Sequence, residues 1–159
     1  MPDMLVKLYD LPDHKEEIAA LRAAGVDIRR AIAPERGLVA AWVRHHFSEY
    51  WVSECEVAFT REPVACYIAV EENRLLGFAC YDATMRGFFG PTGVALEARG
   101  RGIGRALLLV TLHAMLATGY GYAIIGGVGP AEFYAKAVGA TLIDGSAPGI
   151  YRGLLRPPS

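Results

Sequence analysis

Alternating glycines follow an apolar, strand-like segment and precede a long apolar helical pattern in the run from Arg99 to Arg105. Because glycine has no side chain, main-chain N–H groups in such a turn can approach a ligand closely. The N-terminus of the following helix adds the positive end of its dipole. These features predict an anion site, and a pyrophosphate suits it best. The candidate residues are Arg99, Gly100, Arg101, Gly102, Ile103, Gly104 and Arg105.

Two other phosphate-binding motifs do not fit this turn. A P-loop has the pattern GxxxxGK[ST], and the required lysine and hydroxyl are missing here. The dinucleotide fingerprint GxGxxG needs its third glycine where the chain has Leu107 or Arg105, depending on the starting glycine. The spacing therefore argues against a dinucleotide-binding oxidoreductase and leaves the pattern [Q/R]xxGx[G/A].

The composition limits the classes of protein that need to be considered. The chain has 159 residues and a formal net charge of −1, with 53% hydrophobic residues, so we expect one domain over residues 1–159. A near-neutral chain without a basic stripe is unlike a nucleic-acid-binding module. No apolar run reaches the length of about 18 residues that predicts a membrane span. The N-terminus lacks the features of a secretory signal, so we expect a cytoplasmic protein.

The cysteines give no sign of a disulfide framework or a zinc site. Cys55, Cys66 and Cys80 are odd in number, contain no CxxC pair and have mainly apolar neighbours. We therefore interpret them as small buried hydrophobic side chains and expect no metal site.

Hydrophobic periodicity and turn residues predict the order of the structural elements. Helices are expected over residues 13–24, 34–46, 48–59, 102–118 and 130–138, and strands over 5–8, 26–31, 64–70, 75–81, 87–94 and 122–128. A hairpin turn is expected at Glu72-Asn73, and a final strand pair at 141–144 and 149–154. This order indicates an α+β fold with a mixed sheet, in which the crossover helix joins two parallel strands. Residues 1–25 form a strand–helix unit that could be an N-terminal extension.

With these residues and elements in place, the sequence resembles the GCN5-related N-acetyltransferase superfamily over about residues 64–154, and more loosely from residue 26. The turn at residues 99–104 is similar to motif A of that family, which holds the pyrophosphate of acetyl-coenzyme A (acetyl-CoA). Val94 is similar to the strand residue beside the pantetheine arm. Residues 132–140 resemble the later FYxKxGF element, which here contains Tyr134.

The resemblance implies a mostly antiparallel central sheet flanked by helices, with the strands at 87–94 and 122–128 splayed to admit the pantetheine arm. It implies that main-chain groups at Thr92, Gly93 and Val94 bind this arm and that the glycine turn binds the phosphates. A main-chain N–H near Val94 would stabilise the oxyanion of the tetrahedral intermediate. Tyr134 would donate a proton to the leaving thiolate.

The residue that accepts the proton of the amine is left open by the sequence. Neither splayed strand contains a carboxylate, and Gly127 stands where family members often have asparagine. The acidic candidates are Glu54, Glu56, Glu71 and Asp82. Among them, Glu54 and Glu56 lie near Trp42, Tyr50 and Trp51, and acids beside aromatic rings would attract a cationic amine. The alternative is that these aromatic rings fill the core.

The expected function is transfer of an acetyl group from acetyl-CoA to a primary amine of a small molecule, a protein N-terminus or a lysine. The alternative is a non-catalytic sensor of the same fold that binds acyl-CoA. The resemblance and the high apolar content also suggest a homodimer.

Overall fold

A single mixed sheet of seven strands organises the protein, and the computed structural model describes all residues from 1 to 159. The strand order is β2-β3-β4-β5-β6-β1-β7, and every neighbouring pair is antiparallel except β5 and β6. This confirms the predicted fold class. The strands are β1 (Met4–Lys7), β2 (Asp27–Arg30), β3 (Cys66–Glu71), β4 (Arg74–Tyr81), β5 (Phe88–Val94), β6 (Tyr122–Ile125) and β7 (Thr141–Leu142).

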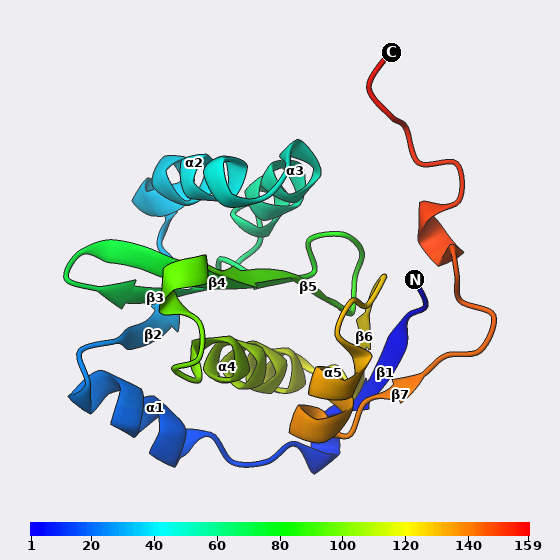
Figure 1. Cartoon of the computed structure of the whole chain (residues 1–159). Coiled ribbons are helices and arrows are strands. Elements are labelled where there is room, and N and C mark those ends of the chain that lie inside the picture. The colour runs from blue at the N-terminus through cyan, green and yellow to red at the C-terminus, as the bar shows by residue number, and fades with distance from the viewer.

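Helices cover both faces of the sheet (Figure 1). On one face lie α2 and α3, and on the other lie α1 and α4, with α5 beside α4. The helices are α1 (Lys15–Ala23), α2 (Arg36–His46), α3 (Glu49–Ala58), α4 (Ile103–Thr118) and α5 (Ala131–Val138). Apolar residues surround most of α4, and Leu107, Leu108, Leu109 and Leu112 are fully buried. A helix of this composition must be packed on several sides, which fixes its N-terminus firmly against the sheet.

Local sequence signals set the ends of these elements. Ser48 caps α3, where its hydroxyl accepts a hydrogen bond from the main-chain N–H of Trp51 at 3.3 Å. Glu72 and Asn73 both have positive φ angles, of 48° and 66°, and form the predicted tight turn between β3 and β4. Gly119 ends α4 in the left-handed conformation, with a φ of 116°.

Strands β5 and β6 separate after a short region of pairing. They pair only at Phe88 with Ile124 and at Phe89 with Ile125, whereas β5 continues to Val94. The predicted splay is therefore confirmed, although the predicted strand at 122–128 ends earlier, at Ile125. The chain leaves the sheet there because Gly127 has a φ of 54° and donates its N–H to a carboxylate oxygen of Asp3 at 2.8 Å.

The prediction of a final strand pair is wrong. Only Thr141–Leu142 forms a strand, and it pairs with β1 rather than with residues 149–154. Residues Gly149–Tyr151 form a short 3-10 helix, because Gly149 and Gly153 have φ angles of 63° and 73° that an extended strand does not adopt. Beyond this helix the chain runs toward α3, where the hydroxyl of Tyr50 donates to the carbonyl oxygen of Leu155 at 2.7 Å.

The N-terminal strand–helix unit is built into the sheet rather than placed at its edge. Strand β1 lies between β6 and β7, and Met4, Val6 and Leu8 are buried. Helix α1 packs against α4. None of the helices combines the length and the apolarity that crossing a membrane requires.

Candidate active site

The N-terminus of α4 carries a continuous row of unpaired main-chain donors. Every N–H group from Gly100 to Arg105 lacks an acceptor within the protein, and the regular helical pattern begins with the N–H of Ala106 bonded to the carbonyl oxygen of Gly102. Gly100 and Gly102 have φ angles of 83° and 81°, a region that favours glycine. The predicted turn is therefore an open cradle of donors at the positive end of the helix dipole.

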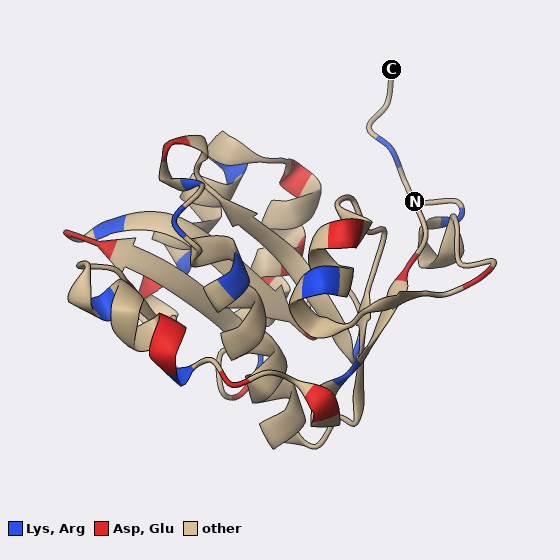
Figure 2. Ribbon diagram, turned by 60° about the horizontal axis from the view of Figure 1, so that its bottom comes forward, with Lys and Arg blue, Asp and Glu red and all other residues tan.

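The arginine side chains of this turn form ion pairs and hydrogen bonds with other groups of the protein. Arg101 forms an ion pair with Glu71 at 2.7 Å, and Arg105 pairs with Glu17 at 3.5 Å. The Nε atom of Arg99 donates to the carbonyl oxygen of Val94 at 3.2 Å. Figure 2 shows Lys and Arg segments interspersed with Asp and Glu segments. The unpaired main-chain N–H groups, rather than a basic patch, are thus the main feature of the turn that could bind an anion.

A small cavity of about 460 Å³, called the second cavity below, lies beside the start of α4 and the end of α5. Its charged lining residues are Lys7, Asp10, Arg105 and Lys136. Positive charges outnumber negative ones here, so this cavity extends the anion-attracting region beyond the cradle.

The unpaired half of β5 presents main-chain groups to the gap between β5 and β6. The N–H of Ala95 bonds to the carbonyl oxygen of Leu76 on β4, and hydrogen-bonding direction alternates along an antiparallel strand. The N–H and C=O groups of Thr92 and Val94 therefore point away from β4, toward the gap. The ring of Phe47 packs directly against the main chain of Gly93, so a Cβ atom at this position would overlap the ring.

A large cavity of about 940 Å³ continues from this gap to the face of the sheet covered by α3. It is bordered by α3, the loop between β4 and β5, strand β5 and the loop after β6. Residues 148–154, called the C-terminal segment below, complete its border. Both Glu54, on α3, and Tyr134, on α5, line it, although these helices lie on opposite sides of the sheet. The splay thus brings two predicted catalytic residues to one space.

Tyr134 is a phenol in an apolar setting. Its side chain lies edge-on to the rings of Phe89 and Phe133, with centroid distances of 6.4 and 5.1 Å. Only 7% of the residue is exposed, and its hydroxyl has no hydrogen-bond partner in the protein. Burial raises the pKa of Tyr134, so the hydroxyl remains protonated at neutral pH and can act as a donor.

Glu54 is the one acidic side chain that faces the cavity. The hydroxyl of Thr84 donates to its carboxylate at 2.5 Å. Burial raises the pKa of Glu54, and the bond from Thr84 opposes this shift with a smaller effect. A carboxylate with a raised pKa is a stronger base than an exposed one and can accept a proton from an amine.

The other acidic candidates are engaged elsewhere. Glu56 pairs with Arg36 at 2.8 Å and is not among the residues that line the cavity. The Arg101 guanidinium holds the pKa of the Glu71 carboxyl below its usual range. The carboxylate of Asp82 accepts hydrogen bonds from the hydroxyl of Tyr120 at 2.9 Å and from the N–H of Gly87 at 2.7 Å, which fix the loop between β4 and β5.

The aromatic residues near Glu54 divide between the cavity and the core. Tyr50 and Trp51 line the cavity. Trp42 does not; its ring lies tilted against that of His46, with a centroid distance of 4.3 Å, and packs against Phe78. Trp42 therefore follows the alternative in which the ring fills the core.

Sequence reasoning missed the C-terminal contribution to the cavity. Ile150, Tyr151 and Leu154 line it, and the Tyr151 ring lies 3.4 Å from the position that a Cβ atom would take on Gly127. Burial raises the pKa of Tyr151. The sequence signal for this contact is the set of glycines at positions 126, 127 and 129, directly after β6. A main chain without side chains leaves room for an aromatic ring from another segment.

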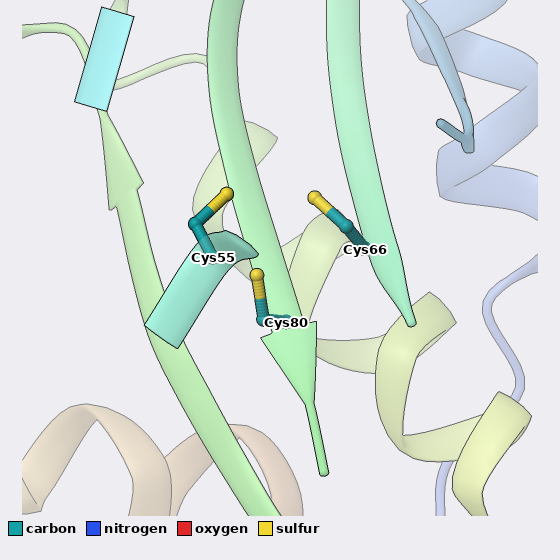
Figure 3. A group of neighbouring side chains, drawn as sticks. All are labelled: Cys55, Cys66 and Cys80. Atoms are coloured by element: carbon teal, nitrogen blue, oxygen red, sulfur yellow. The ribbon is translucent and has the colours of Figure 1, made fainter. Parts of the chain in front are cut away.

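The three cysteines form a cluster that their spacing in the sequence did not predict (Figure 3). Cys55 comes from α3, and Cys66 and Cys80 face each other across β3 and β4. Their sulfur atoms lie within 4.8 Å of one another, so together they could act as ligands to a soft metal ion. All three are fully buried in the core, away from the cavity, and burial raises the pKa of the Cys80 thiol. They pack as the predicted small hydrophobic residues.

Comparison with known proteins identifies the family and the fold of the chain. The family model described as the acetyltransferase (GNAT) family matches residues 27–139. The chain belongs to this family. No curated protein sequence matches it significantly.

Solved structures with the same fold share little sequence with this chain. A GCN5-related N-acetyltransferase from Sphaerobacter thermophilus superposes with a TM-score of 0.68 at 20% identity, covering 89% of this chain and 48% of the other. One from Kribbella flavida gives 0.61 at 19% identity, with 89% and 53% coverage. The glucosamine N-acetyltransferase region of a fungal multi-domain GH3 β-N-acetylglucosaminidase gives 0.71 at 17% identity, with 89% and 19% coverage. The chain thus spans about half of these proteins or less.

Proposed function

We propose that this protein transfers an acetyl group from acetyl-CoA to a primary amine. The observation that carries the proposal is the row of unpaired N–H donors from Gly100 to Arg105, which suits the pyrophosphate of coenzyme A. The second cavity, with Lys7 and Lys136, lies beside this cradle and suits the remaining phosphate of the nucleotide.

The thioester end would lie in the gap between β5 and β6. The outward-facing N–H and C=O groups of Thr92 can form strand-like hydrogen bonds with the amide groups of the pantetheine arm, whereas the carbonyl oxygen of Val94 already accepts from Arg99 and only the N–H of Val94 is free. This arrangement would bring the acetyl carbonyl into the large cavity that Tyr134 and Glu54 line. The N–H of Val94 would then donate to the carbonyl oxygen as it becomes an oxyanion.

The reaction would proceed by direct attack of a neutral amine. The amine nitrogen forms a bond to the carbonyl carbon, and the proton that it loses passes to the carboxylate of Glu54. The bond between the carbonyl carbon and sulfur then breaks, and the coenzyme A sulfur takes a proton from the hydroxyl of Tyr134. Solvent restores the proton of Tyr134 and removes that of Glu54.

Release of free coenzyme A thiol tests the proposal directly. The protein is incubated with acetyl-CoA and a panel of amines that includes amino acids, polyamines, aminoglycosides, aromatic amines and peptides. We expect amine-dependent thiol release and an acetylated product. Tight binding of acetyl-CoA with no turnover on any amine would instead support the acyl-CoA sensor.

A further inference from the structure

We propose that the acceptor is a small primary amine with an apolar body and without a carboxylate or phosphate group. This inference rests on the proposed function and specifies the acceptor for the same cavity. It is carried by the charge and the chemistry of the cavity wall around Glu54 and by the way the C-terminal segment covers it.

The cavity wall has a single charged side chain. Glu54 is the only acidic residue among those that line it, and no Lys, Arg or His is present. A bound ammonium group can therefore be attracted by Glu54, whereas a carboxylate or phosphate would lie near a negative charge without any cationic side chain to pair with it. Zwitterionic amino acids and phosphorylated amines do not suit such a wall.

The rest of the wall offers apolar and aromatic contacts. Helix α3 contributes Trp51 and Val57, and the loop between β4 and β5 contributes Met85. The C-terminal segment adds Ile150 and Leu154. These side chains can bury an aliphatic or aromatic body next to the ammonium group, and aromatic rings add cation–π attraction. A small polar amine or a polyamine would leave this surface without a partner.

The C-terminal segment limits the size of the acceptor. Residues of this segment line the cavity together with residues of α3, and the bond between the Tyr50 hydroxyl and the Leu155 carbonyl oxygen connects the segment to α3. Part of the 940 Å³ must also accommodate the thioester end of acetyl-CoA. The remaining space suits a small molecule rather than the surface of a folded protein.

Matched acceptors test the inference on the unmodified protein. The value of kcat/KM is measured at saturating acetyl-CoA for 2-phenylethylamine, phenylalanine, phenylalaninamide and ethanolamine. Phenylalanine adds only a carboxylate to 2-phenylethylamine, and phenylalaninamide restores the bulk of that group without its charge. We expect phenylalanine to be poorer by about 10- to 100-fold, because its carboxylate is left unpaired. Phenylalaninamide should stay near 2-phenylethylamine, and ethanolamine should be a weak acceptor.

A designed cation in the wall should reverse part of this preference. Ile150→Arg places a guanidinium in the cavity wall and should raise the phenylalanine to 2-phenylethylamine ratio by about fivefold or more. Leu116→Arg is the matched control, because Leu116 lies on α4 outside the cavity and is 38% exposed, compared with 39% for Ile150. This control should leave the ratio unchanged.

The possible outcomes separate the two proposals. If phenylalanine, ethanolamine or a peptide N-terminus is the best acceptor, the inference about the acceptor is overturned while acetyl transfer stands. If no amine is acetylated although acetyl-CoA binds, the proposed function itself is overturned. A preference for 2-phenylethylamine and phenylalaninamide, together with the shift in Ile150→Arg, supports both.

Discussion

Alanine substitutions at the two ends of α4 can separate the role of the donor cradle from its cost in stability. Gly102 lies at the start of α4 with a φ of 81°, and Gly119 lies at its end with a φ of 116°. A Cβ atom at either position would meet no other atom within 4 Å, so Gly102→Ala and Gly119→Ala both act through backbone strain rather than through a clash. Left-handed conformations cost non-glycine residues about 1–2 kcal/mol, so both variants should unfold at lower temperature, by about 2–8 °C.

Only Gly102→Ala should also weaken binding of coenzyme A. Relief of the strain would rotate the peptide groups on either side of residue 102, and these include the donors that form the cradle. Loss of one hydrogen bond to a charged phosphate costs about 1.5–3 kcal/mol, or about a 10- to 100-fold rise in Kd. Isothermal titration calorimetry with coenzyme A and thermal unfolding provide the two measurements. Equal affinity of the two variants for coenzyme A would refute the reasoning.

Three further substitutions test other parts of the site. Tyr134→Phe should lower kcat by about 100-fold or more and leave the affinity for coenzyme A unchanged, as steady-state kinetics and calorimetry can show; an unchanged kcat would exclude the proton-donor role. Because burial raises the pKa of Glu54, kcat/KM should rise with pH through a value above the ordinary range of glutamate, and Glu54→Gln should remove this limb from the pH profile. A charged Glu54 bears a desolvation cost, so stability should fall as pH rises through its folded pKa, and Glu54→Gln should be at least as stable as the parent at pH 7 in chemical denaturation. In Gly93→Ala the new Cβ must displace the Phe47 ring, and urea titration should show a loss of about 1–3 kcal/mol; an unchanged midpoint would mean that the ring adapts freely.

The cradle was predictable from the sequence because its signal is local. Gly100 and Gly102 adopt the positive φ angles that only glycine accepts readily, and their spacing before an apolar helix marks the turn. The hairpin at Glu72 and Asn73 was predictable for the same reason, since neighbouring residues alone determine it.

Which glutamate of α3 faces the cavity could not be predicted in the same way. Glu54 and Glu56 are two positions apart and have the same chemistry, but α3 directs only Glu54 into the cavity. The sequence leaves the rotation of a short helix uncertain when its pattern is weakly amphipathic, and α3 carries apolar side chains toward both the core and the cavity. Tertiary packing decides which acid is buried.

The C-terminal segment shows a further limit of sequence patterns. Ile150 and Leu154 are apolar residues that line the cavity, and their apolarity suggested a strand. The positive φ angles of Gly149 and Gly153 exclude that strand, but a glycine shows its φ angle only in the structure. Long-range contacts, such as that between Tyr50 and Leu155, carry no signal in the local sequence.

The claim on which the account depends is that the main-chain donors at the start of α4 bind the diphosphate of coenzyme A. Amide chemical shifts of the 15N-labelled protein test it most directly, during titration with coenzyme A and, separately, with pantetheine, which lacks the diphosphate. We predict large, saturable shifts of the amides from Gly100 to Arg105 with coenzyme A and none at these residues with pantetheine. Coenzyme A binding that leaves these amides unshifted would contradict the account.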